Sequence, residues 1–487
     1  MKTSGRTTHR MVAFFLITAF VLVACGQKEG VHGGLVAAPG VDPGTGAPVT
    51  PGVDPGTGVP VDPGTGVPVD PGTGTPVDPG AQPGTGPGSG PVIGSDRTGI
   101  FENEIVLGLH APETGAAPIQ AKVFDAGKEL YWKWLHEIKG DKLFGRTVRV
   151  VTADDQYRPT TAVSVCNKMA SQDKAFLLIG GAGTDQINAC ASFADQRGIP
   201  YLSPGVQEAG LNTRRTYFAV TMTYRAQMKP LVQMLKAESK RKNLDTNDDG
   251  SIKVGFVRPN TPNFNDADAE LEAAVAAAGW EYDVYSVVKE GNSTEAQTVA
   301  TQMQQDKVDI AVPITAPTFT TQLAINTGKN NYKPVYAGVA ISNNINQMIN
   351  LACQNDQFEG ALWLSPWPGW KQVNAGQYDK DFRVAAERFA AQYNKRDKGG
   401  DLLLALWGIM KNIHQMFLAA GENVTRESFV ATMNNFRVNP GAFPSLQCSP
   451  TNHFCARNTF VLEGACNDPQ GAQWVTHSRY KNKASSF

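Results

Sequence analysis

The amino-acid sequence predicts an α/β protein built from two lobes, each a mainly parallel sheet wrapped by helices. Three observations predict this fold class. Short β-branched runs alternate with helical patterns from residue 104 onward. The part of the chain with this alternation is about 390 residues long, too much for one compact core. Loops of Gly, Pro, Ser, Thr and Asn follow the strands, as is typical of turns and helix caps at strand ends.

The first half of this alternating part contains three strand-to-helix units and a further strand. In each unit an apolar run, a turn-forming loop and a helical pattern follow one another. The units are Ile105–Leu109 with the helix Ile119–Ile138, residues 147–155 with the helix Ala162–Ala170, and residues 175–183 with the helix Gln186–Arg197; a strand follows at residues 200–205.

The second half repeats the pattern, which predicts a second sheet. Its units are residues 253–260 with the helix Ala267–Ala278, residues 281–288 with the helix Thr294–Gln305, and residues 308–315 with the helix Thr318–Gly328; a strand follows at residues 334–340. Strands that alternate with helices in this way pair in parallel, and the helices cover both faces of the sheet.

Five loops at strand ends are candidates for a binding site, because such sheets bind ligands beyond the carboxyl ends of their strands. Their backbone donors and helix N-termini suit an anionic or zwitterionic small molecule. The loops are His110–Gly115, Gly180–Asp185, Ser203–Gln207, Pro259–Phe264 and Pro313–Thr318. The candidate ligand contacts within them include Glu113, Gly183, Gly205, Val206, Asn263, Phe264 and Thr315. The alternative is that these residues only turn the chain and cap helices.

The N-terminal segment predicts export and a lipid anchor. Its apolar run, Met11–Ala24, has only about two thirds of the ~20 residues that a membrane-spanning helix needs. Basic residues precede the run, as in a secretory signal: Lys2, Arg6 and Arg10. The tetrapeptide LVAC, which ends at Cys25, resembles the lipobox of bacterial lipoproteins. The resemblance implies that residues 1–24 are removed and that Cys25 is lipidated; an ordinary signal peptide and a signal anchor are the alternatives.

Residues 25–100 are predicted to be a disordered linker. The motif VDPGTG recurs there, followed by a truncated VDPG, and the copies begin at Val41, Val53, Val61, Val69 and Val77. Proline removes a backbone donor and glycine is costly to order, so a stretch with few large apolar side chains buries too little surface to fold.

The charge balance and the motif inventory exclude several classes of function. The chain has 44 basic and 45 acidic residues, which gives no indication of a nucleic-acid partner. It contains no nucleophile elbow, no HExxH and no Cys/His metal spacing, so we expect no enzyme, no cofactor and no metal. The loop Asp245–Ser251 has the oxygen spacing of a calcium loop, but Phe256 occupies the position of the bidentate glutamate. A calcium site and a polar turn are the two readings of that loop.

Three stretches resemble the bacterial type I periplasmic binding proteins of ABC importers, in the leucine/isoleucine/valine-binding branch. They are IVLGLHAPETG, LIGGAGTDQINACASFADQRGIPYLSPG and DLLLALWGIMKNIHQMFLAAG, and the resemblance extends over nearly all of Asn103–Lys481. It implies two Rossmann-like lobes with parallel-core sheets joined by a three-strand hinge. The chain would cross between lobes near Thr221, Pro366 and Phe436. Lobe 1 is then residues 101–221 plus 366–436, and lobe 2 is residues 222–365 plus 437–487.

The resemblance also implies ligand contacts, position by position. In these proteins backbone amides and hydroxyls of lobe 1 hold the carboxylate of an amino acid, and an acid after a strand of lobe 2 holds its ammonium. The lobe 1 contacts fall on Gln120, Thr184, Asp185, Gly205 and Gln207. The expected acid of lobe 2 is missing, because Val339 and Ala340 stand there. Either Asp185 or Glu113 replaces it, or the ligand is of another class, since a buried unpaired ammonium is costly.

Aromatic residues near the expected cleft give a second indication. Tyr224 and Phe264 would lie near its rim, and three tryptophans surround the second crossing: Trp363, Trp367 and Trp370. Aromatic faces suit planar, apolar or cationic ligands, so Tyr224, Phe264 and Trp367 are candidate contacts. The alternative for the tryptophans is that they pack the hinge.

The six cysteines other than Cys25 predict three disulfides, because the chain is exported. Cys166 and Cys190 lie on successive helices of lobe 1 and form the first expected pair. The other four allow three connectivities. The preferred pairs are Cys448–Cys455 and Cys353–Cys466. Each bridge then stays inside one lobe, and the cleft remains free to open.

We therefore expect a monomeric, lipid-anchored receptor on the extracytoplasmic face of the cell membrane. It closes two lobes around a small polar ligand, which is amino-acid-like or another small carboxylate, amide or aromatic compound. It then delivers that ligand to an ABC permease. The alternative is a sensor or adaptor of the same fold that signals to a membrane kinase, and the long spacer favours it mildly.

Overall fold

The computed structural model describes residues 95–203, 209–288, 291–339, 346–439 and 443–477. Residues Pro91–Phe487 form one compact unit. The predicted signal segment, Cys25 and residues 25–94 of the predicted linker lie outside the described ranges.

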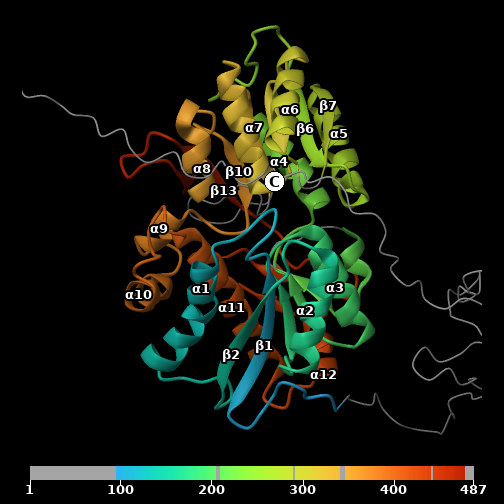
Figure 1. Ribbon diagram of the computed structural model, residues 1–487, viewed down its shortest axis with the longest axis vertical. Coiled ribbons are helices and arrows are strands. Elements are labelled where there is room, and N and C mark those ends of the chain that lie inside the picture. The colour runs from blue at the N-terminus through green and yellow to red at the C-terminus, as the bar shows by residue number, and fades with distance from the viewer. Residues whose placement is uncertain (1–94, 204–208, 289–290, 340–345, 440–442, 478–487) are drawn as a thin grey trace, which may run out of the picture. The chain divides into compact units, whose positions relative to one another are not determined.

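The first sheet of the compact unit belongs to lobe 1, the lower lobe in Figure 1. Its strand order is β2-β1-β3-β4-β5, and every neighbouring pair is parallel. The strands are β1 (Glu104–Ala111), β2 (Thr147–Asp154), β3 (Leu177–Gly180), β4 (Tyr201–Ser203) and β5 (Tyr217–Ala219). All five carboxyl ends therefore lie at one edge of the sheet.

The second sheet, in lobe 2, has seven strands in the order β14-β13-β10-β9-β8-β6-β7. The strands are β6 (Lys253–Pro259), β7 (Glu281–Val287), β8 (Ile310–Pro313), β9 (Val335–Val339), β10 (Leu362–Ser365), β13 (Phe460–Ala465) and β14 (Gln473–Thr476). The last two add to the parallel core as an antiparallel edge. The predicted α/β fold with two parallel-core sheets is confirmed.

Helices cover both faces of each sheet. Those of lobe 1 are α1 (Ala121–Lys133), which continues as the π-helix η1 (Trp134–Ile138), α2 (Pro159–Ser171), α3 (Thr184–Gln196), the 3₁₀-turn η2 (Ala209–Thr213), α9 (Trp370–Asn374), α10 (Lys380–Phe389), α11 (Gly400–Ala420) and α12 (Arg426–Met433). Those of lobe 2 are α4 (Tyr224–Glu238), the 3₁₀-turn η3 (Pro262–Phe264), α5 (Asn265–Ala278), α6 (Ser293–Gln305), α7 (Pro317–Lys329), α8 (Asn346–Ala352) and the 3₁₀-turn η4 (Cys353–Asn355).

Each sheet has an apolar core on either face. In β1, Ile105 and Leu107 pack into the core with α1 and α11, whereas Val106 packs into the core with α2 and α3. In β6, Phe256 and Val257 divide in the same way between the two cores of lobe 2. Alternate residues of a strand point to opposite faces, which is why these buried strands are apolar at nearly every position.

The helix α11 is the most apolar helix of lobe 1. By length and composition it could cross a membrane, but 72% of its most apolar window is buried inside the lobe. It packs along α1 beneath the first sheet, so we interpret it as a core helix.

The third crossing between the lobes lies later than expected. Phe443 and Cys455 pack in the core of lobe 1, and Phe454 pairs with Ala219 at the end of β5. A Cβ at Gly408 of α11 would lie 1.8 Å from the Phe443 ring. The ring can therefore pack on α11 at this position only because residue 408 has no side chain. Phe443 lies between the two strands of a short ribbon, β11 (Arg437–Val438) and β12 (Leu446–Gln447). The chain returns to lobe 2 between residues 456 and 460, and the expected crossing near residue 436 is wrong.

The folded part also begins earlier than the predicted linker boundary at residue 100. Asp96 forms an ion pair of 2.9 Å with Arg426 of α12, and its carbonyl accepts the backbone N–H of the same arginine. This contact joins the start of the described chain to the far end of lobe 1.

All three predicted disulfides are confirmed. Cys166–Cys190 joins α2 to α3, Cys353–Cys466 joins η4 to the end of β13, and Cys448–Cys455 closes a loop of lobe 1. The last pair was expected in lobe 2, but the later third crossing assigns it to lobe 1. Each bridge still lies within a single lobe.

The calcium-like loop Asp245–Ser251 is a hydrogen-bonded turn. The Asp245 carboxylate accepts the backbone N–H groups of Asp249 and Gly250, and Asp249 pairs with Lys307. The Asp245 carboxylate oxygens therefore accept hydrogen bonds that stabilise the turn.

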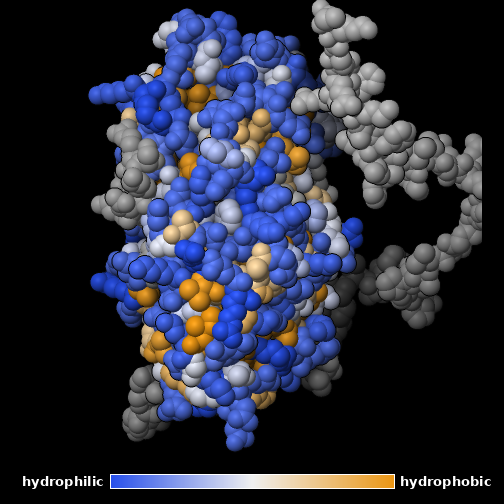
Figure 2. All heavy atoms as spheres, turned by 90° about the vertical axis from the view of Figure 1, so that its left-hand side faces the viewer, coloured by the Kyte–Doolittle hydropathy of each residue, from blue (hydrophilic) through white to orange (hydrophobic). Residues whose placement is uncertain are grey.

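One face of the compact unit is mainly hydrophilic. Figure 2 shows blue side chains over most of this face, with apolar patches concentrated over the lower half. Separate exposed apolar side chains, such as Val384 of α10, are normal on a folded protein.

Candidate functional site

The N-terminus of α3 forms the centre of the candidate site. It follows β3 directly, at the carboxyl edge of the first sheet. Gly183 caps the helix with φ +85, and a Cβ there would lie 2.3 Å from the Oε1 atom of Gln186. Only glycine fits this conformation and this space. The first N–H groups of a helix have no partner within it, so this end can hold an electronegative group.

Lobe 2 contacts the helix end directly. Asn263, in η3 after β6, donates its side-chain N–H to Oδ1 of Asp185 at 2.6 Å. Both residues follow strands, one in each sheet, so the carboxyl edges of the two sheets face each other here. The structure thus brings together two of the predicted ligand contacts from opposite lobes.

An aromatic pair lies beside this contact. The rings of Tyr224 and Phe264 are 5.4 Å apart and inclined by 35°. Burial raises the pKa of Tyr224 to about 12, and a side-chain hydrogen bond with Thr184 acts in the opposite direction. That bond is a second link between the lobes, because Thr184 begins α3 and Tyr224 begins α4.

Gln186 is a candidate residue that sequence reasoning missed. It is the third residue of α3 and is fully buried, yet neither its side-chain oxygen nor its nitrogen has a hydrogen-bond partner. An unpaired buried amide costs roughly 1–3 kcal/mol. Its position against Gly183 places this unpaired amide at the helix end. The only sequence signal was a glutamine two residues after the predicted contact Thr184.

A buried network supports this end of lobe 1 from behind. The Nδ1 atom of His110 donates to Oδ2 of Asp155 at 2.8 Å, and its Nε2 lies 2.6 Å from the hydroxyl of Tyr201. All three side chains are fully buried, and they join the carboxyl ends of β1 and β2 to the first residue of β4. The network therefore fixes the relative position of the loops after β1 and β2, which border the site.

The loop after β2 is held in a strained conformation. Gln156 and Tyr157 have φ values of +55 and +59, which non-glycine residues rarely adopt. The Oδ1 atom of Asp155 accepts the backbone N–H of Tyr157 at 2.9 Å. The Tyr157 ring packs against Gly183, 3.2 Å from where a Cβ would be. Tyr157 is thus a third aromatic residue beside the helix end, and it was not among the contacts predicted from the sequence.

Two other predicted contacts lie between β1 and α1. Glu113 and Thr114 donate their backbone N–H groups to Asp154. Burial raises the pKa of Glu113, as do the carboxylates of Asp125 and Asp154. Gln120 caps α1, and its Oε1 lies 3.3 Å from where a Cβ of Gly399 would be. Glu113 therefore borders the end of β2, and Gln120 borders the start of α11.

The remaining predicted contacts are not joined to this group. Thr315 shares a hydrogen bond with Thr320 inside lobe 2. Trp367 is only 5% exposed and packs in the core of lobe 1, which agrees with the packing alternative. Gly205, Val206, Gln207 and Ala340 lie outside the described residues. For all the predicted residues, contact with a ligand stays a prediction.

The family profile described as periplasmic binding protein matches residues 104–469 of the 487. The chain belongs to the periplasmic binding protein family. The resemblance seen in the sequence is therefore confirmed.

This periplasmic binding protein is similar to proteins that are named for, or were solved with, different ligands. An amino acid binding protein of Pseudomonas aeruginosa is 29% identical over 119 residues, which is 22% of this chain and 30% of that protein's length. A solute binding protein of an ABC transporter from Rhodopseudomonas palustris, solved with 3,4-dihydroxybenzoic acid, has a TM-score of 0.61 at 18% identity, covering 77% of this chain and 97% of its own. A leucine binding protein of Thermotoga maritima has a TM-score of 0.59 at 15% identity, covering 76% of this chain and 97% of its own. At these identities the two structures show the fold alone.

Proposed function

We propose that this periplasmic binding protein captures a small polar ligand between its lobes and delivers it to an ABC importer. The observation that carries the proposal is the contact between Asp185 and Asn263, which joins the carboxyl edges of the two sheets at a helix end whose N-cap residue, Gly183, has no side chain to bond the first N–H groups. A ligand that contacts both edges stabilises closure through bonds that the open form lacks. Family membership supports the same function.

The side chains at the helix end favour a ligand with a hydrogen-bond donor next to an acceptor. Gln186 has an unpaired N–H donor and an unpaired carbonyl acceptor. The Asp185 carboxylate, an acceptor only, holds the Asn263 amide that a ligand N–H or O–H can replace. Amino acids, primary amides and hydroxy acids carry such neighbouring groups.

The aromatic residues add an apolar wall. Tyr157, Tyr224 and Phe264 lie on two sides of the α3 N-terminus. Planar or branched side chains of a ligand gain by packing against such rings. Aromatic acids therefore join amino acids as candidates, in keeping with the 3,4-dihydroxybenzoic acid bound to one similar protein and the leucine named for another.

A thermal-shift and calorimetry panel tests the proposal. The purified protein would be screened against amino acids, primary amides, benzoates and fatty acids. We expect at least one class to bind, with a stabilisation near ~2.7 kcal/mol at a ligand concentration 100 times Kd. Asp185→Ala should weaken that binding, whereas Asp283→Ala, on the outer strand β7, is the matched control. A well-folded protein that binds nothing in the panel contradicts the proposal.

Lipid anchoring at Cys25 is a separate part of the proposal, supported by the LVAC tetrapeptide. The expected product begins at Cys25, carries lipid by mass spectrometry and sediments with membranes. Cys25→Ser should abolish lipidation. A lipid-free chain cleaved at another position would instead indicate an ordinary signal peptide.

A further inference from the structure

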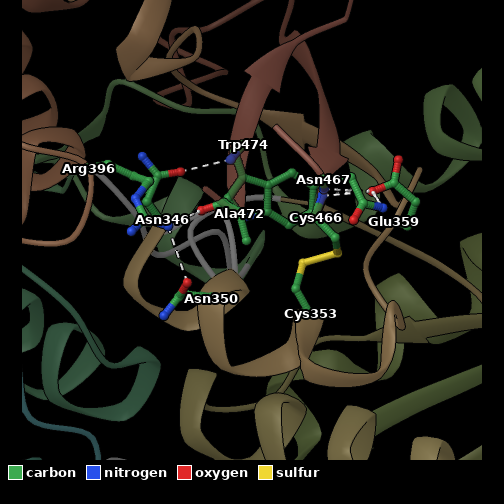
Figure 3. The surroundings of a disulfide bond; sticks show 9 residues. All are labelled: Asn346, Asn350, Cys353, Glu359, Arg396, Cys466, Asn467, Ala472 and Trp474. Atoms are coloured by element: carbon green, nitrogen blue, oxygen red, sulfur yellow. Dashed lines mark hydrogen bonds between the residues drawn. A yellow bond between two sulfur atoms is a disulfide. The ribbon is translucent and has the colours of Figure 1, made fainter. Parts of the chain in front are cut away.

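The lobes meet in a second region, away from the α3 N-terminus. Here the loop between α10 and α11 of lobe 1 reaches α8 and the β13–β14 loop of lobe 2 (Figure 3). Arg396 donates from Nη1 to Oδ1 of Asn350 at 3.2 Å and to the carbonyl of Ala472 at 3.1 Å. One guanidinium group thus holds two elements of lobe 2.

Asp401 makes the neighbouring contact from the start of α11. Its Oδ2 accepts the backbone N–H of Asn346 at 2.5 Å, and its Oδ1 accepts the N–H of Leu402 at 3.0 Å. The carboxylate is only 3% exposed. Because α11 is a core helix, Asp401 is as rigidly held as lobe 1 itself.

The receiving surface of lobe 2 is braced in three ways. The Asn346 side chain accepts the backbone N–H of Trp474 at 2.7 Å, which ties α8 to β14. The disulfide Cys353–Cys466 ties the end of α8 to the end of β13. Glu359 accepts the backbone N–H of Cys466 at 2.7 Å. Figure 3 shows these braces around the same short segment.

A glycine leaves room for the Arg396 contact. Gly471, with φ +92, would place a Cβ 2.4 Å from the Nη1 atom of Arg396. A larger residue there is strained and displaces the guanidinium, so the backbone at residue 471 accommodates this charged side chain.

We propose that Arg396 and Asp401 are positioning residues that act as a latch, stabilising the closed lobes and tightening ligand binding without touching the ligand. The inference rests on the proposed function and adds its regulation. The latch bonds cross between lobes, so opening breaks them and closure restores them. Their partners are backbone groups and a neutral amide in the braced segment. They therefore favour closure equally for every ligand.

The test compares variants of the latch in the purified protein. Arg396→Met removes the guanidinium, and Asn350→Ala removes one of its acceptors from the opposite lobe. Arg383→Met is the matched control, since Arg383 pairs with Glu387 on the surface of α10. We expect each latch variant to weaken every ligand that binds the wild type by the same factor, about 2- to 10-fold. The double variant should lose less than the product of the two.

A second readout needs no ligand. Hydrogen exchange at the Asn346 amide and in α8 should quicken in Arg396→Met, and the radius of gyration from X-ray scattering should rise. A loss confined to one ligand class overturns the latch, as does unchanged exchange together with unchanged scattering. If the wild type binds nothing in the panel, the proposed function fails, while exchange and scattering still decide the latch.

Discussion

The two regions where the lobes meet differ in the kind of group that makes the contact. At the α3 N-terminus the partners are side chains, Asp185 with Asn263 and Thr184 with Tyr224. At the latch the partners in lobe 2 are mainly backbone groups, the N–H of Asn346 and the carbonyl of Ala472. A ligand can replace side-chain contacts, but it cannot replace contacts built into the backbone.

The two regions therefore have separate roles in the closure of the lobes around a ligand. Changes at the α3 N-terminus should alter which ligand binds, and changes at the latch should alter how readily the lobes close. The following predictions test that separation, beginning with the largest expected effect.

The disulfide behind the latch should matter most for stability. Cys353–Cys466 spans 113 residues and Cys448–Cys455 spans 7, so loop-closure entropy favours the longer link. Replacing both cysteines of the longer link by serine should cost about 4–5 kcal/mol of unfolding free energy, against about 2–3 kcal/mol for the shorter link. Urea unfolding measures both. Equal losses of unfolding free energy would show that the longer disulfide stabilises the protein no more than the shorter one does.

Gln186→Met should separate binding from stability. Removing the unpaired amide should stabilise the ligand-free protein by about 1 kcal/mol and weaken ligands with a donor and an acceptor by about 10- to 100-fold. Gln196→Met, on the exposed side of the same helix, is the control. Thermal unfolding and calorimetry give the two values. A variant that loses stability and keeps its affinity would assign Gln186 a structural role.

Asp401 should make closure depend on pH. Burial raises its pKa to about 6, while the backbone amides of Asn346 and Leu402 act in the opposite direction. Opening hydrates the carboxylate and returns its pKa toward 3.8. The closed form therefore binds the proton more tightly, closing takes up a proton, and the Asp401 contact favours closure most when the carboxyl is protonated. Affinity should rise about tenfold from pH 7.5 to pH 5 for a ligand that does not titrate in that range.

The control for this pH effect is Asp401→Asn, whose profile should be flat. Beside the latch, burial raises the pKa of Asp468, but the hydrogen bonds with Lys371, Gln470 and Gln473 and the charge of Lys371 together outweigh it and hold that pKa below its ordinary value. An affinity that falls in acid, or an unchanged profile in the variant, contradicts the assignment to Asp401.

Tyr224→Phe should have the smallest effect. It keeps the ring beside Phe264 and removes only the hydroxyl that bonds Thr184, so we expect a loss of about threefold in affinity. Calorimetry with the same ligands measures it. A loss as large as that of Gln186→Met would mean that the hydroxyl itself contacts the ligand.

The fold could be read from the sequence because its signals are local. Short apolar runs such as LLIG at residues 177–180 and the helical patterns after them each formed the predicted element. The disulfides followed from the order of these elements. Gly183 was selected because it lies in a turn-rich loop after a strand, and it caps α3.

The residues that were missed depend on packing between distant segments. The third crossing is set by Phe443 on Gly408 and by Phe454 beside Ala219, and no periodic pattern marks either contact. In the sequence Gln186 is an ordinary helix residue and Asp401 an ordinary acid in a first helical turn. Their roles follow only from what buries them.

The bond between Cys353 and Cys466 encloses the whole excursion through α9 to α12, so a large part of lobe 1 is a covalent loop whose two ends are fastened in lobe 2. When the two ends of the chain are pulled apart, the force passes through the disulfide bond and not through that loop. The oxidised chain should reach full extension roughly 370–410 Å short of the reduced one, because 113 residue steps carry no load. If the chain is pulled at Cys25, the part of lobe 1 from α9 to α12 is thereby shielded from the force, whereas the α3 N-terminus is not.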